Sequence, residues 1–317
     1  MLIRPALREY RTWSMDSRRW AGYEPRSDDI VIATAPKCGT TWTQQIVASL
    51  IFQDGRPRSL PAVSPWMEAR FKGFSEEVFE TLEAQTHRRF IKTHLPVDGL
   101  PLYDEVRYIH VARDGRDTVM SMHNHFTGYA PAQFENFDRI GLEDPAIGRT
   151  YPRFPASPAE YFRIWISTPS FPGQTEGTPN PSFFDLEAGY WAERRRPNLL
   201  LVHYSDLKAD LDGEMRRIAS FLDIPIDKAI WPALVAAAKF ETMRAVGGEL
   251  MPQMKTMFAE GPTRFFNKGV NGRWRDVFTD EDLALYDAKV REKCSPGLAA
   301  WLEGGRQGAG DPRQRPD

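Results

Sequence analysis

The sequence predicts one α/β domain in which a central parallel sheet is flanked by helices. Short, apolar, β-branched segments alternate with segments whose apolar residues recur at helical spacing, and this alternation is typical of that class. Neither an internal repeat nor a linker divides the 317 residues into halves. The composition, with 41% hydrophobic and 26% charged residues, is ordinary for a globular protein with a sizeable core.

Four segments are expected to form the strands of this sheet. Each is short and apolar on both faces, as in a parallel sheet that helices cover on both sides. The first of them leads through a tight loop directly into a helical pattern, which gives the order strand, loop, helix. The expected strands are residues 29–35, 89–92, 105–112 and 198–203.

The helices are expected between these strands and after the last one. After Asp206, for example, Met215, Ile218, Ala219 and Leu222 lie on one face at helical spacing. The expected helices are residues 40–52, 76–84, 117–125, 157–167, 183–195, 206–222 and 229–240, and a last helix begins after the capping residue Thr279.

Two segments lack this regularity. Apart from one short helix, residues 128–182 are expected to be irregular, because they are rich in Pro, Gly and aromatic residues. A long segment of this kind is typical of a lid or a binding region. Residues 304–317, mostly Gly, Arg and Pro, are expected to be a disordered tail, which leaves residues 1–303 as the domain.

Charge and composition argue against several classes of function. The 41 Lys and Arg against 43 Asp and Glu give a formal charge of −2, which argues against a broad nucleic-acid surface. No apolar run approaches the ~20 residues of a membrane span. The N-terminal residues lack the apolar core of a secretory signal, and two cysteines, Cys38 and Cys294, are too few for a disulfide scaffold. We expect a cytoplasmic protein with neither nucleic acid nor membrane as a partner.

The strongest functional signal is Ala35-Pro36-Lys37-Cys38-Gly39-Thr40-Thr41-Trp42, between the first strand and the first helix. A strand, a tight loop and a helix N-terminus form an anion site, to which Lys37 adds a charge. In a Walker A loop Lys follows the last Gly, whereas Lys37 precedes Gly39. No predicted strand ends in the acidic residue that would hold Mg²⁺. The sequence therefore predicts a P-loop-like phosphate site without a metal.

Five segments together resemble the PAPS-dependent sulfotransferases of the cytosolic type. The loop just described is similar to the family's 5′-phosphosulfate loop, and the other four segments occur in family order. They are residues 92–96, 108–121, 204–208 and 266–274. The resemblance covers about residues 29–290. It implies transfer of a sulfonate group from PAPS to a hydroxyl of a small acceptor, with release of PAP. Because residues 128–182 are rich in aromatic residues, we expect the acceptor to be lipophilic or aromatic and to lie beside that segment.

The resemblance also implies roles for individual residues. His94 is implied as the catalytic base. The implied nucleotide site comprises Lys37, Cys38, Gly39, Thr40 and Thr41 at the 5′-phosphosulfate, Trp42, Phe240 and Tyr204 at the nucleoside, and Arg113, Ser121, Asn267, Lys268 and Gly269 at the 3′-phosphate.

The reaction itself explains why these residue types are needed. Transfer to a hydroxyl requires a base for the acceptor proton, and His94 follows a strand and has an ordinary pKa near ~6.5. Lys37 and Lys92 can neutralise the charge that develops on the leaving phosphate. A histidine at a strand end is by itself more often structural, and its position after Lys92 is what favours catalysis.

Three features depart from the family pattern. Cys38 replaces the usual Ser, and we favour a neutral replacement over an oxidation-sensitive thiol with a lowered pKa. Asn267 stands where many members have Arg, so Arg273 or Lys268 would have to compensate. The family's C-terminal dimer motif matches only at Thr279, so no oligomeric state is predicted.

Two other functions remain open. The alternative enzyme is a P-loop small-molecule kinase that uses ATP. The position of Lys37 and the lack of a metal-binding carboxylate after a predicted strand argue against this kinase. The third reading is a nucleotide-binding module without catalysis. The presence of both Lys37 and His94 argues against it. The aromatic residues in and beside 128–182 are expected either to line an apolar acceptor pocket or to form a small core of their own.

Overall fold

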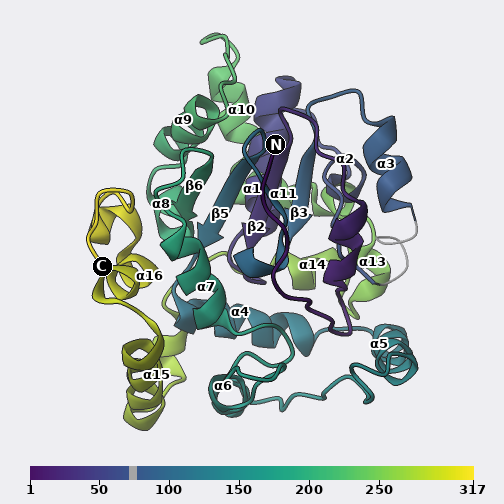
Figure 1. Cartoon of the computed structure of the whole chain (residues 1–317), viewed down its shortest axis with the longest axis vertical. Coiled ribbons are helices and arrows are strands. Elements are labelled where there is room, and N and C mark those ends of the chain that lie inside the picture. Colours follow the sequence, from purple (N-terminus) through teal and green to yellow (C-terminus); the bar gives the residue numbers. More distant parts are fainter. Residues whose placement is uncertain (71–76) are drawn as a thin grey trace.

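A four-stranded parallel sheet lies at the centre of the structure, a computed structural model that describes residues 1–70 and 77–317 (Figure 1). The strand order is β3-β2-β5-β6, and all neighbours are parallel. The strands are β2 (Ile30–Thr34), β3 (Phe90–Thr93), β5 (Arg107–Ala112) and β6 (Leu199–His203). The predicted fold class and all four predicted strands are confirmed.

The register brings the carboxyl ends of the strands to one edge. Thr34 of β2 pairs with Val111 of β5, and Ala112 pairs with His203 of β6. Loops that follow the strands therefore meet at this edge, which is where open α/β sheets bind their ligands.

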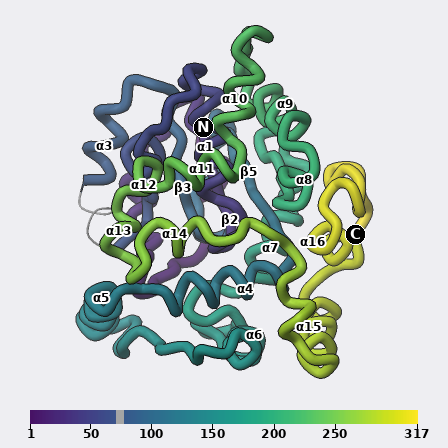
Figure 2. Tube along the Cα trace, turned by 180° about the vertical axis from the view of Figure 1, so that it is seen from behind, coloured from purple at the N-terminus to yellow at the C-terminus, as the bar shows by residue number. Residues whose placement is uncertain are grey.

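Helices cover both faces of the sheet. Helix α7 lies in front of it in Figure 1, and the view from behind in Figure 2 shows α11 and α12 on the opposite side. Helix α1 packs against β2 and β3. The bounds are α1 (Thr40–Phe52), α2 (Leu60–Val63), α3 (Val78–Ala84), α4 (Gly115–Phe126), α5 (Pro131–Glu143), α6 (Pro158–Ser167), α7 (Phe183–Ala192), α8 (Tyr204–Ala209), α9 (Leu211–Phe221), α10 (Trp231–Ala237), α11 (Phe240–Ala245), α12 (Gly247–Leu250), α13 (Met254–Met257), α14 (Pro262–Phe265), α15 (Asp280–Lys293) and α16 (Pro296–Ala309).

The remaining elements are short. A two-stranded antiparallel sheet pairs β1 (Leu2–Arg4) with β4 (Leu102–Tyr103). Three 3₁₀ turns are η1 (Ser17–Gly22), η2 (Val97–Gly99) and η3 (Arg273–Asp276). The predicted helix over 206–222 is divided into α8 and α9, because Asp210 ends the first and caps the second through Gly213 N. The start of the helix predicted over 76–84 lies partly outside the described residues.

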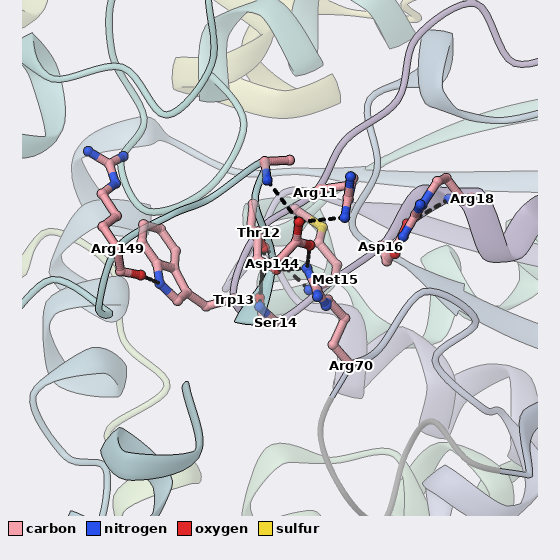
Figure 3. Close-up of polar contacts among 11 residues, drawn as sticks. Arg11, Thr12, Trp13, Ser14, Met15, Asp16, Arg18, Arg70, Asp144 and Arg149 are labelled. Atoms are coloured by element: carbon pink, nitrogen blue, oxygen red, sulfur yellow. Dashed lines mark hydrogen bonds and ion pairs between the residues drawn. The ribbon is translucent and has the colours of Figure 1, made fainter. Parts of the chain in front are cut away.

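The segment 128–182 is more regular than predicted. It contains the predicted α6 and also α5, whose N1 residue is Pro131. The carboxylate of Asp144, at the end of α5, accepts hydrogen bonds from Arg11 and from Arg70, the latter at 2.6 Å (Figure 3). Ion pairs to residues far away in the sequence thus anchor this segment to the N-terminal part of the chain, and the sequence pattern could not show them.

The C-terminal residues also differ from the prediction of a disordered tail. Helix α16 continues to Ala309, and the chain then folds back over Arg194. The buried Arg194 guanidinium donates to the carbonyls of Pro312 and Arg315, both at 3.0 Å. The backbone N–H of Arg306 donates to Asp206 at 2.7 Å. Polar contacts to the backbone, which composition does not reveal, hold these residues in place.

Among the described residues, no helix has the length and apolar character that crossing a bilayer requires.

Removing residues 304–317 should destabilise the protein. Arg194 would lose the carbonyls of Pro312 and Arg315 as partners and keep that of Trp191, and Asp206 would lose the backbone N–H of Arg306. Each lost hydrogen bond costs about 0.5–1.5 kcal/mol. We expect the free energy of unfolding, measured by urea titration followed by circular dichroism, to fall by several kcal/mol. Arg139→Ala, which removes an exposed ion pair with Glu143, is the control and should change it by less than about 0.5 kcal/mol. If the truncation left the urea midpoint of unfolding unchanged, the docking of residues 304–317 on the domain would be contradicted.

Candidate active site

A cleft opens at the carboxyl edge of the sheet. The loops after β2, β3 and β5 and the start of α8 after β6 contribute to its wall, together with the segment from α11 to η3. All the residues that the sequence predicted for the site line it, with one exception. They are Lys37, Gly39, Thr40, Thr41, Trp42, Lys92, His94, Arg113, Ser121, Tyr204, Phe240, Asn267, Lys268 and Gly269.

The loop between β2 and α1 presents the N-terminus of the helix to the cleft. Lys37 and Gly39 both have positive φ, 70° and 113°, and a Cβ on Gly39 would lie 3.1 Å from the Tyr204 ring. Gly39 is therefore required by conformation and by packing. No side chain caps α1, so its first N–H groups remain available to an anion. Thr40 is held by Thr34, with 2.6 Å between their hydroxyl oxygens.

Cys38 is the exception. Its side chain is fully buried, 3.4 Å from the hydroxyl of Thr118, and does not line the cleft. Burial raises the pKa of the thiol and outweighs the opposing effect of Lys37 and Arg113. The low-pKa thiol considered as an alternative is therefore wrong, and the neutral replacement fits the structure.

Positive charge is concentrated in the cleft. Five Lys and Arg side chains line it, whereas Asp117 is the only carboxylate in the lining that the described residues form. Burial, with Lys92 and Arg113 nearby, lowers the pKa of Lys37 to about 7. Burial lowers the pKa of Lys92 to about 8. A polyanionic nucleotide fits this set of side chains, because its charges would relieve the repulsion among the cations.

Arg113 is fixed from several sides, although its Nε atom is buried without a partner. Its guanidinium donates to the carbonyl of Lys37 at 3.2 Å and to Oδ1 of Asn271 at 2.8 Å. It also lies over the Tyr204 ring at 4.1 Å. The contact with Asn271 links Arg113 to the loop that carries Lys268, so the strand end and this loop form one anion-binding wall.

Aromatic rings border the same wall. The indole N–H of Trp42 donates to the carbonyl of Ala238 at 2.8 Å, and its ring meets Tyr204 edge-on at 5.3 Å. Phe240 lies against Gly269, whose φ is 63° and where a Cβ would approach the ring to 2.7 Å. Gly269 thus allows the loop to close onto Phe240.

His94 is buried, and its ring is held in one orientation. Its Nδ1 lies 2.9 Å from the carbonyl of Thr34, which can only accept, so Nδ1 carries the proton and Nε2 has a free lone pair. Burial, with Lys92 and Lys37 nearby, lowers the pKa of His94 well below its ordinary value. The ring is therefore neutral at pH 7 and available as a base.

Glu68 was not predicted from the sequence, although the strand end that carries His94 depends on it. Its fully buried carboxylate accepts hydrogen bonds from the backbone N–H of His94 at 2.7 Å and from the Thr93 hydroxyl at 2.9 Å. It also accepts from the indoles of Trp66 at 2.6 Å and Trp20 at 3.0 Å. Trp66 in turn lies edge-on to His94 at 5.0 Å, and Nζ of Lys92 lies 4.3 Å from its ring centre.

The remaining part of the cleft wall is apolar and rich in methionine, which was also not predicted. The methionines that line it are Met15, Met120, Met243, Met251, Met254 and Met257. Of the aromatic residues in or beside 128–182, Phe126 and Tyr129 line the cleft. The rest do not, and several pack on one another, as Phe137 and Tyr151 do at 4.8 Å. Two of these aromatic residues thus line the cleft, and several of the others form a small core of their own.

Within residues 1–70 and 77–317, no group of three or more His, Cys, Asp and Glu side chains is placed to hold a metal ion.

Comparisons with known proteins agree with this geometry. A family model described as a sulfotransferase domain matches residues 27–296. A glycolipid sulfotransferase of Mycobacterium tuberculosis is 36% identical over 317 residues, covering 94% of this chain and 95% of the relative. Sulfotransferase 1B1 of mouse is 27% identical over 294 residues, covering 89% of this chain and 88% of the relative.

Solved structures share the fold. Mouse sulfotransferase SULT7A1 complexed with PAP superposes with a TM-score of 0.63 at 20% identity, covering 87% of this chain and 88% of the other. Retinol dehydratase in complex with androsterone and PAP gives a TM-score of 0.65 at 21% identity, covering 88% and 86%. The family model spans most of the chain, and the mycobacterial relative is similar over nearly its whole length. This chain therefore belongs to the sulfotransferase family.

Proposed function

We propose that this protein transfers the sulfonate group of PAPS to a hydroxyl of a small, lipophilic acceptor and releases PAP. The observation that carries this proposal is the cluster of five Lys and Arg side chains, with one carboxylate in the described lining, beside the N-terminus of α1. PAPS would supply the sulfonate group from its 5′-phosphosulfate. The PAP bound in structural neighbours supports this co-substrate.

The parts of the nucleotide correspond to three groups of residues in the cleft. We assign Lys37, Gly39, Thr40 and Thr41 to the 5′-phosphosulfate, Trp42, Tyr204 and Phe240 to the nucleoside, and Arg113, Ser121, Asn267, Lys268 and Gly269 to the 3′-phosphate. Arg273 lines the cleft near Arg113, and burial together with Arg113 lowers its pKa. Its position supports Arg273 as the compensating charge for Asn267.

His94 and the two lysines can share the work of the transfer step. Nε2 of His94 takes the proton of the acceptor hydroxyl while the hydroxyl oxygen bonds to sulfur. The bond from sulfur to the phosphate oxygen breaks, and Lys37 and Lys92 offset the charge left on that oxygen. The hydrogen bond from Nδ1 to Thr34 supports this role, because it leaves Nε2 as the basic atom.

The acceptor would lie along the methionine-rich part of the wall. Methionine side chains are flexible and polarizable, so they can adapt to long or irregular apolar groups. The mycobacterial relative is named a glycolipid sulfotransferase, which supports a lipophilic acceptor here.

Binding of PAP without a metal should distinguish this function from the alternative, an ATP-dependent small-molecule kinase. PAP at 100 times its dissociation constant would stabilise the folded state by about 2.7 kcal/mol. We expect a thermal shift of several degrees with PAP in the absence of Mg²⁺ and a smaller one with ATP or ADP, with or without Mg²⁺. Equal or greater stabilisation by Mg-ATP would contradict the sulfotransferase assignment in favour of the kinase.

His94→Ala should abolish turnover and keep nucleotide binding. Loss of a positioned base lowers a rate by about 10²–10⁴-fold, whereas the PAP thermal shift should persist, because the anion loop and Arg113 are unchanged. His87→Ala is the matched control, since His87 contacts Phe52 and the carbonyl of Arg88 and does not line the cleft. Undiminished sulfonation of every acceptor by the His94 variant would remove His94 from the base role.

The affinity for PAP should fall as the pH rises above 7. The pKa of Lys37 is about 7 in the free protein, and a bound anion raises it, so binding above pH 7 requires proton uptake. Affinity should be nearly constant just below pH 7 and then decrease by at most about tenfold per pH unit for each proton taken up. Calorimetric titration between pH 6.5 and 9 measures this dependence.

Lys37→Arg provides the control for this pH dependence. Its guanidinium stays charged throughout the range, so the decrease should begin nearer the pKa of Lys92, about 8. A wild-type affinity that does not change between pH 7 and 9 would contradict the low pKa of Lys37.

A further inference from the structure

The proposed transfer step uses neither His125 nor Asn180, although both line the cleft. His125 lies near the end of α4, and Asn180 lies in the segment between α6 and α7. Their neighbours in the cleft wall include the apolar Met15, Phe126 and Tyr129. A buried polar side chain usually has a hydrogen-bond partner, so polar groups in such a wall require an explanation.

Aromatic rings and Lys37 orient the ring of His125. It makes edge contacts with four rings at centroid distances of 4.9 to 5.9 Å, those of Phe126, Tyr129, Phe258 and Phe265. Its Nδ1 lies 3.4 Å from Nζ of Lys37. When the anion is bound, Lys37 is an ammonium group, which only donates, so Nδ1 accepts and Nε2 carries the proton. Within the described parts of the chain, Nε2 has no hydrogen-bond partner.

The electrostatic surroundings keep His125 neutral. Burial, with Lys37, Lys92 and His94 nearby, lowers its pKa well below the ordinary value. Arg264 also faces it and acts in the same direction. A neutral ring with its proton on Nε2 offers one N–H donor to a ligand in the cleft.

Asn180 provides a second unused group. The residue is 6% exposed, and its Nδ2 atom is buried without a partner. Its backbone N–H donates to the carbonyl of Gly177 at 2.9 Å, which fixes the segment locally. An unpaired buried amide has lost its hydration without a replacement, and a ligand hydroxyl can supply the missing hydrogen bond.

We propose that the acceptor carries a second hydroxyl beside the one that reacts, as the headgroup of a sugar-bearing lipid does, and that His125 and Asn180 bind it. A hydroxyl both donates and accepts, so it can accept from Nε2–H of His125 and from Nδ2 of Asn180. A sterol or phenol with a single hydroxyl, which His94 engages, leaves both side chains unpaired. This inference rests on the proposed function and adds the class of headgroup.

Two alcohols with the same alkyl chain test the inference. With PAPS as donor, we expect a higher kcat/KM for n-octyl β-D-glucoside than for 1-octanol. His125→Phe keeps an aromatic ring and Asn180→Leu keeps the side-chain volume, while each removes the hydrogen bond. Each variant should lower the ratio of the two kcat/KM values by about tenfold. The control His123→Phe should keep the ratio, because Nε2 of His123 lies 3.0 Å from the carbonyl of Pro155 and the residue does not line the cleft.

The outcomes separate this inference from the proposed function. A wild-type enzyme that sulfonates 1-octanol as efficiently as the glucoside overturns the inference alone, and this result requires no variant to fold. A thermal shift with PAP identifies the variants that fold. If those variants keep the wild-type ratio of the two kcat/KM values, the inference is also overturned. A protein that PAP does not stabilise and that transfers to neither alcohol overturns the proposed function, and the inference with it.

Discussion

The cost of holding several cations together in a partly dehydrated cleft shapes the rest of this site. Lys37, Lys92 and Arg113 repel one another, and burial penalises the charge of the two lysines, as their lowered pKa values show. Such a cluster persists only if the surrounding fold holds each side chain in place. The repulsion disappears when a polyanion binds, so the same arrangement that destabilises the free protein favours a highly charged nucleotide.

The parallel sheet supplies the rigidity that this cluster needs. The anion loop, His94 and Arg113 follow three neighbouring strands whose ends are aligned by the register of β2 with β3 and β5. The buried carboxylate of Glu68 adds a second constraint, because it binds the backbone of His94 and the indole of Trp66. The strands thus fix where the anion loop, His94 and Arg113 lie, and the carboxylate of Glu68 fixes the orientation of the end of β3 and of the adjoining Trp66.

The other side of the cleft is built from parts that are distant in sequence. The N-terminal segment brings Met15 to the wall, and Asp144 at the end of α5 binds Arg11 and Arg70 on either side of it (Figure 3). Ion pairs and aromatic packing therefore hold this side of the cleft, whereas backbone hydrogen bonds of the sheet hold the side that the strand ends form.

The sequence by itself determined the four strands, the first helix and most of the residues that line the cleft beside the strand ends. These depend on local patterns: apolar runs, Gly39 in a tight loop, and basic residues at or directly after strand ends. Only the tertiary structure decided that α5 forms, that the C-terminal residues dock on the domain and that Glu68 binds the strand end of His94. Their stability comes from partners far along the chain, such as Arg70 for Asp144 and Arg194 for the carbonyl of Pro312. The motif places Cys38 beside the nucleotide, but no local pattern shows that its side chain is buried against Thr118, away from the cleft.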